Sequence, residues 1–108
     1  MSELEEYEIA VLLQMHDKWI VGKENYISIE KTSSKIKWQE IARAYRVKKK
    51  FKSVARGLVN RLLVSDDGKS LQVLYLDKLG VDFVGGWLQL HPTAMKDLEN
   101  KLRKDIKL

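Results

Sequence analysis

Apolar side chains recur at helical spacing in four stretches of the chain, and the most regular of these is residues 50–63. Its apolar positions follow the order i, i+3, i+4, i+7, i+8 and i+11, at Phe51, Val54, Ala55, Leu58, Val59 and Leu62. This spacing predicts a helix that buries one face in a core and exposes the other. Residues 37–45 predict a shorter helix just before it, with one apolar face formed by Ile41, Ala42 and Tyr45.

Two longer helices are predicted at the ends of the chain. Residues 3–20 carry a wide apolar face, and Ser2 before them is the expected N-cap. Residues 93–107 follow Pro92, which suits a first helical turn, and His91 at the cap position. Their apolar stripe consists of Met95, Leu98, Leu102 and Ile106. We expect this stripe either to pack on the first helix or, with Leu4, Tyr7 and Val11, to form the seam of a homodimer.

Shorter alternating patterns predict strands between the helices. Residues 26–30 predict a short strand or extended loop, and a polar turn, KTSSK, follows at 31–35. Beyond Val64, residues 71–76 predict one strand, 77–82 a loop and 83–90 a second strand. Gly85 and Gly86 would mark a bulge in that second strand. An alternative is a hairpin that turns at Asp66–Gly68 and pairs residues 62–65 with 70–74.

The basic charge of the chain is concentrated in one segment. The 108 residues carry a net charge of +5. Residues 38–64 hold eight Lys or Arg against the single acid Glu40, a net charge of +7, so the remaining residues carry −2. Positive charge gathered on one helix pair is the electrostatic footprint of a nucleic-acid-binding protein.

Composition excludes several other classes of protein. There is no cysteine, so disulfides, thiolate nucleophiles and thiolate metal sites are absent. No apolar run has the length of a membrane span, and the N-terminus is acidic, so we expect a cytoplasmic protein. The only histidines, His16 and His91, have no metal-ligand spacing. No pattern indicates catalysis, a metal or a cofactor, and we expect a protein that is not an enzyme.

Two kinds of residue carry alternative interpretations. Gly57 lies inside the predicted helix 50–63, where glycine costs about 1 kcal/mol relative to alanine. We favour close packing on a neighbouring helix as its reason, with close approach to a phosphate as the alternative. Trp19, Trp38 and Trp87 lie at the edges of predicted elements, and we expect core anchors rather than platforms for base stacking.

The order helix, strand, helix, helix, strand, strand, helix resembles winged helix-turn-helix proteins, and most closely the MarR-type transcriptional regulators. Leu58-Val59-Asn60-Arg61-Leu62 is similar to the end of that family's recognition helix. Leu90-His91-Pro92-Thr93-Ala94, followed by Leu98, is similar to the end of its wing. The resemblance covers residues 38–98. In the wing loop, Asp77 and Asp82 surround Lys78 where the family offers arginine to the minor groove.

The resemblance and the patterns together predict an α+β, mostly α, fold of a single domain over residues 1–108. We expect a helix-turn-helix at 37–64, a wing at 65–90 with a two- or three-stranded sheet, and a C-terminal helix at 92–107. A winged helix of this kind binds double-stranded DNA by placing its second helix in the major groove. We therefore expect a DNA-binding protein that acts as a transcriptional regulator.

Each basic or polar residue of the predicted interface has an expected role. Arg43, Arg46, Lys48, Lys49 and Lys50 would contact phosphates, and Lys78 would contribute from the wing. The outer face of helix 50–63 carries Lys52, Ser53, Arg56 and Asn60. Lys52 would lead into the groove, while Arg56 and Asn60 would reach guanine and adenine edges. The alternative is a protein–protein interaction module, which the acidic wing and the wide apolar face of helix 3–20 favour. RNA binding has less support, because no aromatic platform is evident.

Overall fold

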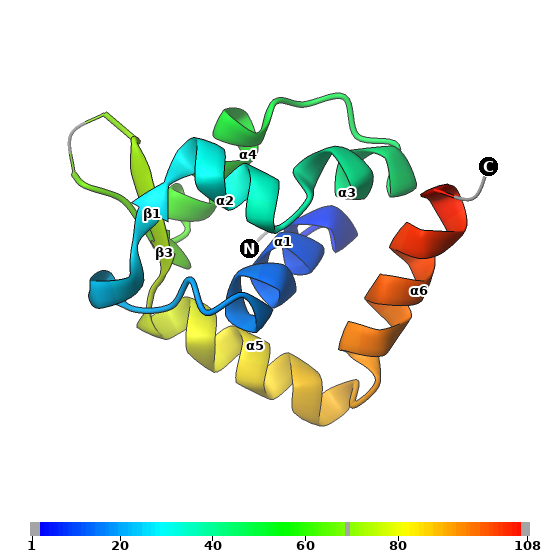
Figure 1. Cartoon of the computed structure of the whole chain (residues 1–108). Helices are drawn as coiled ribbons and strands as arrows, with labels where there is room; N and C mark the ends of the chain where they lie inside the picture. The colour runs from blue at the N-terminus through cyan, green and yellow to red at the C-terminus, as the bar shows by residue number, and fades with distance from the viewer. Residues whose placement is uncertain (1–2, 69, 107–108) are drawn as a thin grey trace.

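The first helix, α1 (Glu6–Asp17), lies at the centre of the molecule, and the other helices pack around it (Figure 1). This computed structural model describes residues 3–68 and 70–106, the last two of them by their backbone alone. The predicted cap Ser2 lies outside the described residues. Glu5 occupies the N-cap position instead, and its backbone N–H donates to Glu8 Oε1 over 2.8 Å in a capping box.

The described residues form a mostly helical α+β structure with a small antiparallel sheet. After α1 the elements follow in the order η1 (Lys23–Asn25, one turn of 3-10 helix), β1 (Ile27–Ser28), α2 (Ile29–Lys35), α3 (Trp38–Ala44), α4 (Phe51–Asn60), β2 (Val64–Ser65), β3 (Val73–Leu76), α5 (Lys78–Leu90) and α6 (Ala94–Ile106). The predicted helices at 37–45 and 50–63 correspond to α3 and α4. The mixed, mostly helical class expected from the sequence is therefore confirmed.

The three strands form a sheet in the order β1-β3-β2. Ile27 pairs with Leu74, and Val64 pairs with Leu76. Strands β2 and β3 are thus a hairpin, as in the alternative that turns near Asp66–Gly68, although the observed pairing is shifted and the loop is longer. Two carboxylates shape this loop: Asp66 Oδ1 accepts from the Gly68 N–H at 2.9 Å, and Asp67 Oδ1 accepts from the Ser70 N–H at 3.2 Å.

The prediction of a loop at 77–82 and a strand at 83–90 is wrong, because these residues form helix α5. The side chain of Asp77 caps the helix by accepting the Lys78 N–H at 2.8 Å, and it also accepts the Ser65 hydroxyl. The buried residues Gly80 and Val84 lie four positions apart on the side that packs toward α1. A Cβ at Gly80 would lie 2.2 Å from the Leu63 carbonyl oxygen, so glycine permits this close packing.

The polar turn predicted at 31–35 is also wrong, because residues 29–35 form helix α2. Ser28 caps it by accepting the Lys31 N–H at 3.2 Å. Thr32 is fully buried, and its hydroxyl donates to the Ser28 carbonyl at 3.0 Å. A buried hydroxyl satisfied in this way lets a polar sequence pack as a helix.

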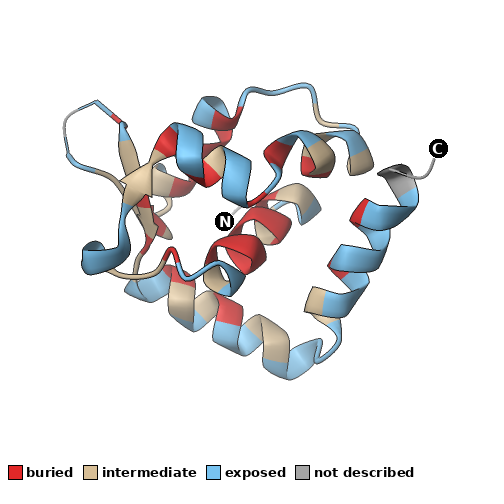
Figure 2. Ribbon diagram, in the orientation of Figure 1, coloured by how far each residue is buried: buried red, intermediate tan, exposed pale blue. Residues whose placement is uncertain are grey.

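The core surrounds α1, whose residues from Ala10 to Met15 are all buried (Figure 2). The wide apolar face of this helix is therefore used inside the chain. An aromatic cluster joins α1 to the helix pair: the ring of Trp38 lies 6.3 Å from that of Tyr7 and 5.7 Å from that of Phe51, centroid to centroid.

The C-terminal helix α6 packs mainly against α3. Leu98 and Leu102 are buried in the core, so the apolar stripe is used within one chain, and the side chain of Ile106 lies outside the described part. His91 is the C-cap of α5 rather than the N-cap of α6, and Pro92 lies two residues before α6 begins. The segment Leu90–Ala94 consequently joins two helices, and its expected place at the end of the wing is wrong.

Candidate nucleic-acid interface

The connection between α3 and α4 begins with a helix-ending turn that uses arginine where glycine is usual. Arg46 has a left-handed backbone, with φ +56°. Its N–H donates to the Arg43 carbonyl at 3.3 Å, and the Val47 N–H donates to the Ala42 carbonyl at 2.8 Å. These two bonds form a Schellman motif, which satisfies the last carbonyls of α3. The glycine-free turn is therefore well defined, at a cost of about 1 kcal/mol for the left-handed residue.

The same C-terminal turn ends α1 and α4. Trp19 and Leu62 occupy the left-handed position there, with φ +63° and +65°. Because this position points the side chain outward, Trp19 is 80% exposed, and its expected role as a core anchor is wrong. Trp38 is buried as expected, and Trp87 is half-buried.

The three lysines that follow Val47 run in a segment without helix before α4, and all three are exposed. Lys50 is the N-cap of α4, and its carbonyl accepts the Ser53 N–H at 3.0 Å. Lys49 instead points back to α1, where its ammonium donates to the Tyr7 hydroxyl at 3.2 Å. This hydrogen bond, with help from Glu8 and Glu5, raises the pKa of Lys49 above its ordinary value.

Helix α4 has one buried face and one polar face, as its spacing predicts, but Leu62, predicted on the buried face, lies beyond the end of the helix and is 66% exposed. The buried face consists of Phe51, Val54, Ala55 and Leu58. The exposed residues Lys52, Ser53, Arg56 and Asn60 follow one another along the opposite side. Arg43 and Arg46 are also exposed. The structure thus presents every interface residue of the helix pair to solvent, with Lys49 turned toward α1.

Six of these residues form what we call the basic segment: Arg43, Arg46, Lys48, Lys50, Lys52 and Arg56. Within the described part of the chain, none of the six forms an ion pair with an acid. Their charges are therefore not neutralised inside the chain. Exposed cations without an acidic neighbour can exchange their counterions for phosphates.

Gly57 lies on the same helix, between the polar face and the buried face. A Cβ at this position would meet no other described atom within 4 Å, beyond its own helix turn. Close packing on a neighbouring helix, the favoured interpretation, is therefore wrong. The glycine leaves an open gap beside Ser53 and Asn60, one turn away on either side.

The wing offers little positive charge. Its loop, residues 66–72, has two acids that shape the turn, and Lys69 lies outside the described residues. Lys78 does not belong to the wing, because it opens α5 and pairs with Asp82 at 3.4 Å. Its assignment as a wing contact is therefore wrong. The candidate interface consists of α4, the turn before it and Arg43 at the end of α3.

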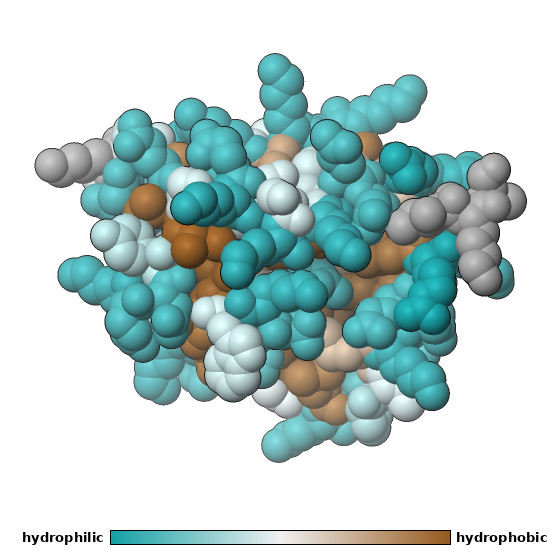
Figure 3. Space-filling model, in the orientation of Figure 1, coloured by the Kyte–Doolittle hydropathy of each residue, from teal (hydrophilic) through white to brown (hydrophobic). Residues whose placement is uncertain are grey.

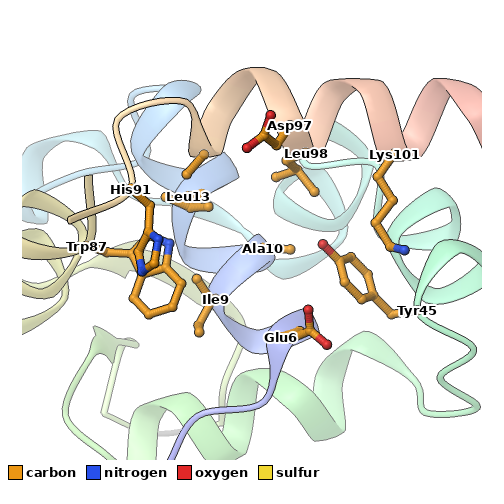
Figure 4. A pocket seen from close by; sticks show the side chains of 11 residues that line it. Glu6, Ile9, Ala10, Leu13, Tyr45, Trp87, His91, Asp97, Leu98 and Lys101 are labelled. Atoms are coloured by element: carbon orange, nitrogen blue, oxygen red, sulfur yellow. The ribbon is translucent and has the colours of Figure 1, made fainter. Parts of the chain in front are cut away.

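A separate pocket of about 320 Å³ lies between α1, the end of α3 and the α5–α6 junction. Figure 4 shows the rings of Trp87 and His91 together on one side and Tyr45 with Lys101 on the other. The His91 ring lies 4.2 Å from that of Trp87, and the Lys101 ammonium lies 4.9 Å from the centre of the Tyr45 ring. Sequence patterns did not indicate this pocket, because its residues come from four distant elements.

Two ionisable groups of this pocket are influenced by their surroundings in the chain. Burial, and to a smaller extent the charge of Glu6, raises the pKa of the Tyr45 hydroxyl. Asp97 accepts the Thr93 hydroxyl at 2.9 Å. Among the residues that the structure describes, no group of three or more His, Cys, Asp or Glu is placed to hold a metal ion.

No protein-family model, curated protein or solved structure matches the chain significantly. Across residues 3–68 and 70–106, no helix has both the length and the apolar character needed to cross a membrane.

Proposed function

We propose that this chain is a double-stranded DNA-binding protein that acts as a transcriptional regulator. The observation that carries the proposal is the two-sided character of α4. One side is buried in the core, while the other side, the preceding turn and the end of α3 bear six exposed cations that form no ion pair with an acid within the described residues. A helix whose inner side is buried in the core and whose outer side is positively charged suits entry into the major groove.

The arrangement around α4 supports a winged helix. The helix pair α3–α4 is followed by the β2–β3 hairpin, and β1 completes an antiparallel sheet in the order β1-β3-β2. Of the two motifs that resemble MarR-type regulators, Leu58–Leu62 lies at the end of α4, while Leu90–Ala94 is far from the wing loop. The proposal therefore rests on the winged-helix arrangement and its charge.

The exposed residues divide into two roles. Arg43, Arg46, Lys48, Lys50 and Lys52 would contact phosphates, which position the protein without specifying sequence. Arg56 and Asn60 lie one turn apart on the outer face, where arginine can pair with guanine and asparagine with adenine. Gly57 lies beside them, and its missing side chain would allow the helix backbone to approach a phosphate.

A salt series tests the phosphate contacts. With about five cations on phosphate, log K for a random duplex should fall with log salt with a slope of roughly −4 to −5. Fluorescence anisotropy of a labelled duplex measures this slope. A slope near zero would rule out the proposal.

Two matched double variants test which surface of the chain binds DNA. Lys48→Gln with Lys50→Gln should weaken binding to all duplexes alike and flatten the slope by about two. Lys96→Gln with Lys104→Gln removes the same charge from exposed positions of α6 and should leave the slope nearly unchanged. Equal effects from the two pairs would reject α4 and its turn as the interface.

The second candidate is a protein–protein interaction module. The acids Asp66 and Asp67 of the wing loop favour it, because a wing that enters the minor groove of DNA usually bears cations. Absence of any complex with random duplex at micromolar protein and low salt would favour this candidate over DNA binding.

A further inference from the structure

Helix α5 has a second apolar side that the chain itself covers only in part. One side, with Gly80 and Val84, is buried toward α1. A different stripe, which we call the α5 seam, consists of Leu79, Phe83, Gly86 and Leu90. Leu79 is 53% and Leu90 77% exposed, and they are among the most exposed large apolar residues of the described chain. Apolar side chains arranged in this way on a helix indicate a surface for a partner.

Gly86 is the residue of the seam that the chain's own packing does not explain. A Cβ there would meet no described atom within 4 Å outside its own helix, whereas a Cβ at Gly80 would collide with the Leu63 carbonyl. Glycine inside a helix costs about 1 kcal/mol relative to alanine. Close packing offsets that cost at Gly80, and a neighbour outside the chain would offset it at Gly86.

A groove runs beside the seam and extends its apolar surface. It has a volume of about 840 Å³ and lies between the start of α1, the residues before β2, and α5. Its apolar lining consists of Leu4, Ile9, Leu63, Phe83 and Trp87. The rings of Phe83 and Trp87 are stacked, with centroids 5.9 Å apart, so that Phe83 is held in place along the groove.

We propose that the α5 seam binds the same helix of a second copy of this chain, antiparallel and related by a two-fold axis. The seam residues are spaced by four, three and four positions, which is the heptad spacing of two helices that pack side by side. A two-fold axis through the middle of the seam places Phe83 over the partner's Gly86 and Leu79 against the partner's Leu90. The Phe83 ring of each copy then fills the space beside the partner's Gly86, and symmetry makes this contact occur twice.

The charges on α5 are compatible with this pairing. Its only charged residues, Lys78 and Asp82, form an ion pair with each other at 3.4 Å, so the helix itself brings no net charge to the proposed contact. In the antiparallel register, Asp82 lies beside the partner's Gln89, whose amide can donate a hydrogen bond to a carboxylate. The seam therefore complements itself in shape and in charge.

The location of the seam leaves the candidate interface open. In Figure 1, α5 runs along the bottom of the molecule and the α3–α4 connection along the top, with α1 between them. The space-filling view shows apolar side chains over the C-terminal half of α5 and mostly polar ones over the upper edge (Figure 3). The proposed dimer goes beyond DNA binding, and either property can fail without the other.

Sedimentation equilibrium of the full chain tests the dimer. The mean mass should rise with concentration from that of the 12.6 kDa chain toward twice that mass. A chain that stays monomeric up to its solubility limit would overturn the proposal.

Matched glycine variants then test the seam. Gly86→Leu should weaken dimerisation at least tenfold, because leucine fills the space of the partner's Phe83, while it favours helix and so does not threaten folding. Gly85→Leu changes an exposed glycine off the seam in the same way and should leave the dimer intact. Non-specific apolar association would instead increase with Gly86→Leu, and an increase or an unchanged dimer would overturn the α5 seam.

Discussion

The ammonium of Lys49 donates a hydrogen bond over 3.2 Å to the hydroxyl of Tyr7, 42 residues earlier in the chain. Tyr7 belongs to α1, and its ring packs with that of Trp38, the first residue of α3. The lysine-rich turn is therefore tied to the central helix at the point where the helix pair begins. One of three consecutive lysines is held by the protein itself, which leaves Lys48 and Lys50 for a partner.

Tyr7→Phe should release Lys49 while keeping the aromatic ring. The pKa of Lys49 should fall toward its ordinary value, because the hydrogen bond to Tyr7 is the largest cause of its rise. NMR titration of the lysine Cε groups measures this change. Since the folded pKa lies above the ordinary 10.5, the contribution of this bond to folding is complete below that pH and is lost only at more alkaline pH. In the salt series the variant should show a slope steeper by up to about one, and a flatter slope would contradict this expectation.

Arg46→Gly should stabilise the fold and weaken DNA binding. Glycine adopts the left-handed backbone of this position without a Cβ penalty, so the free energy of unfolding should rise by about 1 kcal/mol in urea denaturation. The loss of the guanidinium should reduce duplex affinity. Arg46→Ala is the control, because it removes the same charge and keeps the backbone cost. If both variants were equally stable, the left-handed position would not be strained.

Gly57→Ala should likewise raise the stability of the fold and lower the affinity for duplex DNA. Alanine meets no described neighbour at this site and should raise the free energy of unfolding by roughly 0.5–1 kcal/mol. Under the proposed function, its methyl group faces the phosphate that approaches the helix and should lower duplex affinity. Gly85→Ala makes the same change on α5, far from the candidate interface, and should stabilise without altering affinity. Unchanged affinity in Gly57→Ala would remove the backbone contact from the interface.

Ser65→Ala should make the free energy of unfolding vary less with pH in the acid range. The Ser65 hydroxyl, followed by the Lys78 N–H, lowers the pKa of Asp77 below its ordinary 3.8. The contribution of the ionised carboxylate to folding is therefore complete above that pH and is lost as the pH falls through the lowered folded value. At neutral pH the variant should lose about 1 kcal/mol, measured in urea, and the difference should shrink in acid. Ser70→Ala, at an exposed position in the wing loop, is the control, and a loss that is equal at both pH values would contradict the role of Asp77.

Local patterns in the sequence were enough to predict α3, α4 and the exposure of the basic segment. The apolar spacing of residues 50–63 repeats every three or four positions and the charges of residues 43–56 lie in the same short stretch, so residues close in sequence decide which face is buried. The C-terminal helix was predicted on the same basis, and Leu98 and Leu102 of its apolar stripe are buried as an amphipathic helix requires.

Only tertiary contacts decided the elements between them and the direction of several side chains. Residues 78–90 hold three glycines and apolar residues on several faces, so their local pattern favours neither a strand nor a helix. Packing against α1 and against the Leu63 carbonyl stabilises the helix. Strand β1 has two residues, and its pairing with β3 joins Ile27 to Leu74, which are distant in sequence. For the same reason the contact of Lys49 with Tyr7 and the open space at Gly57 became visible only in the folded chain. The spacing of apolar residues along the chain determines which face of a helix is buried. Contacts between distant segments determine which side chains remain accessible on each surface.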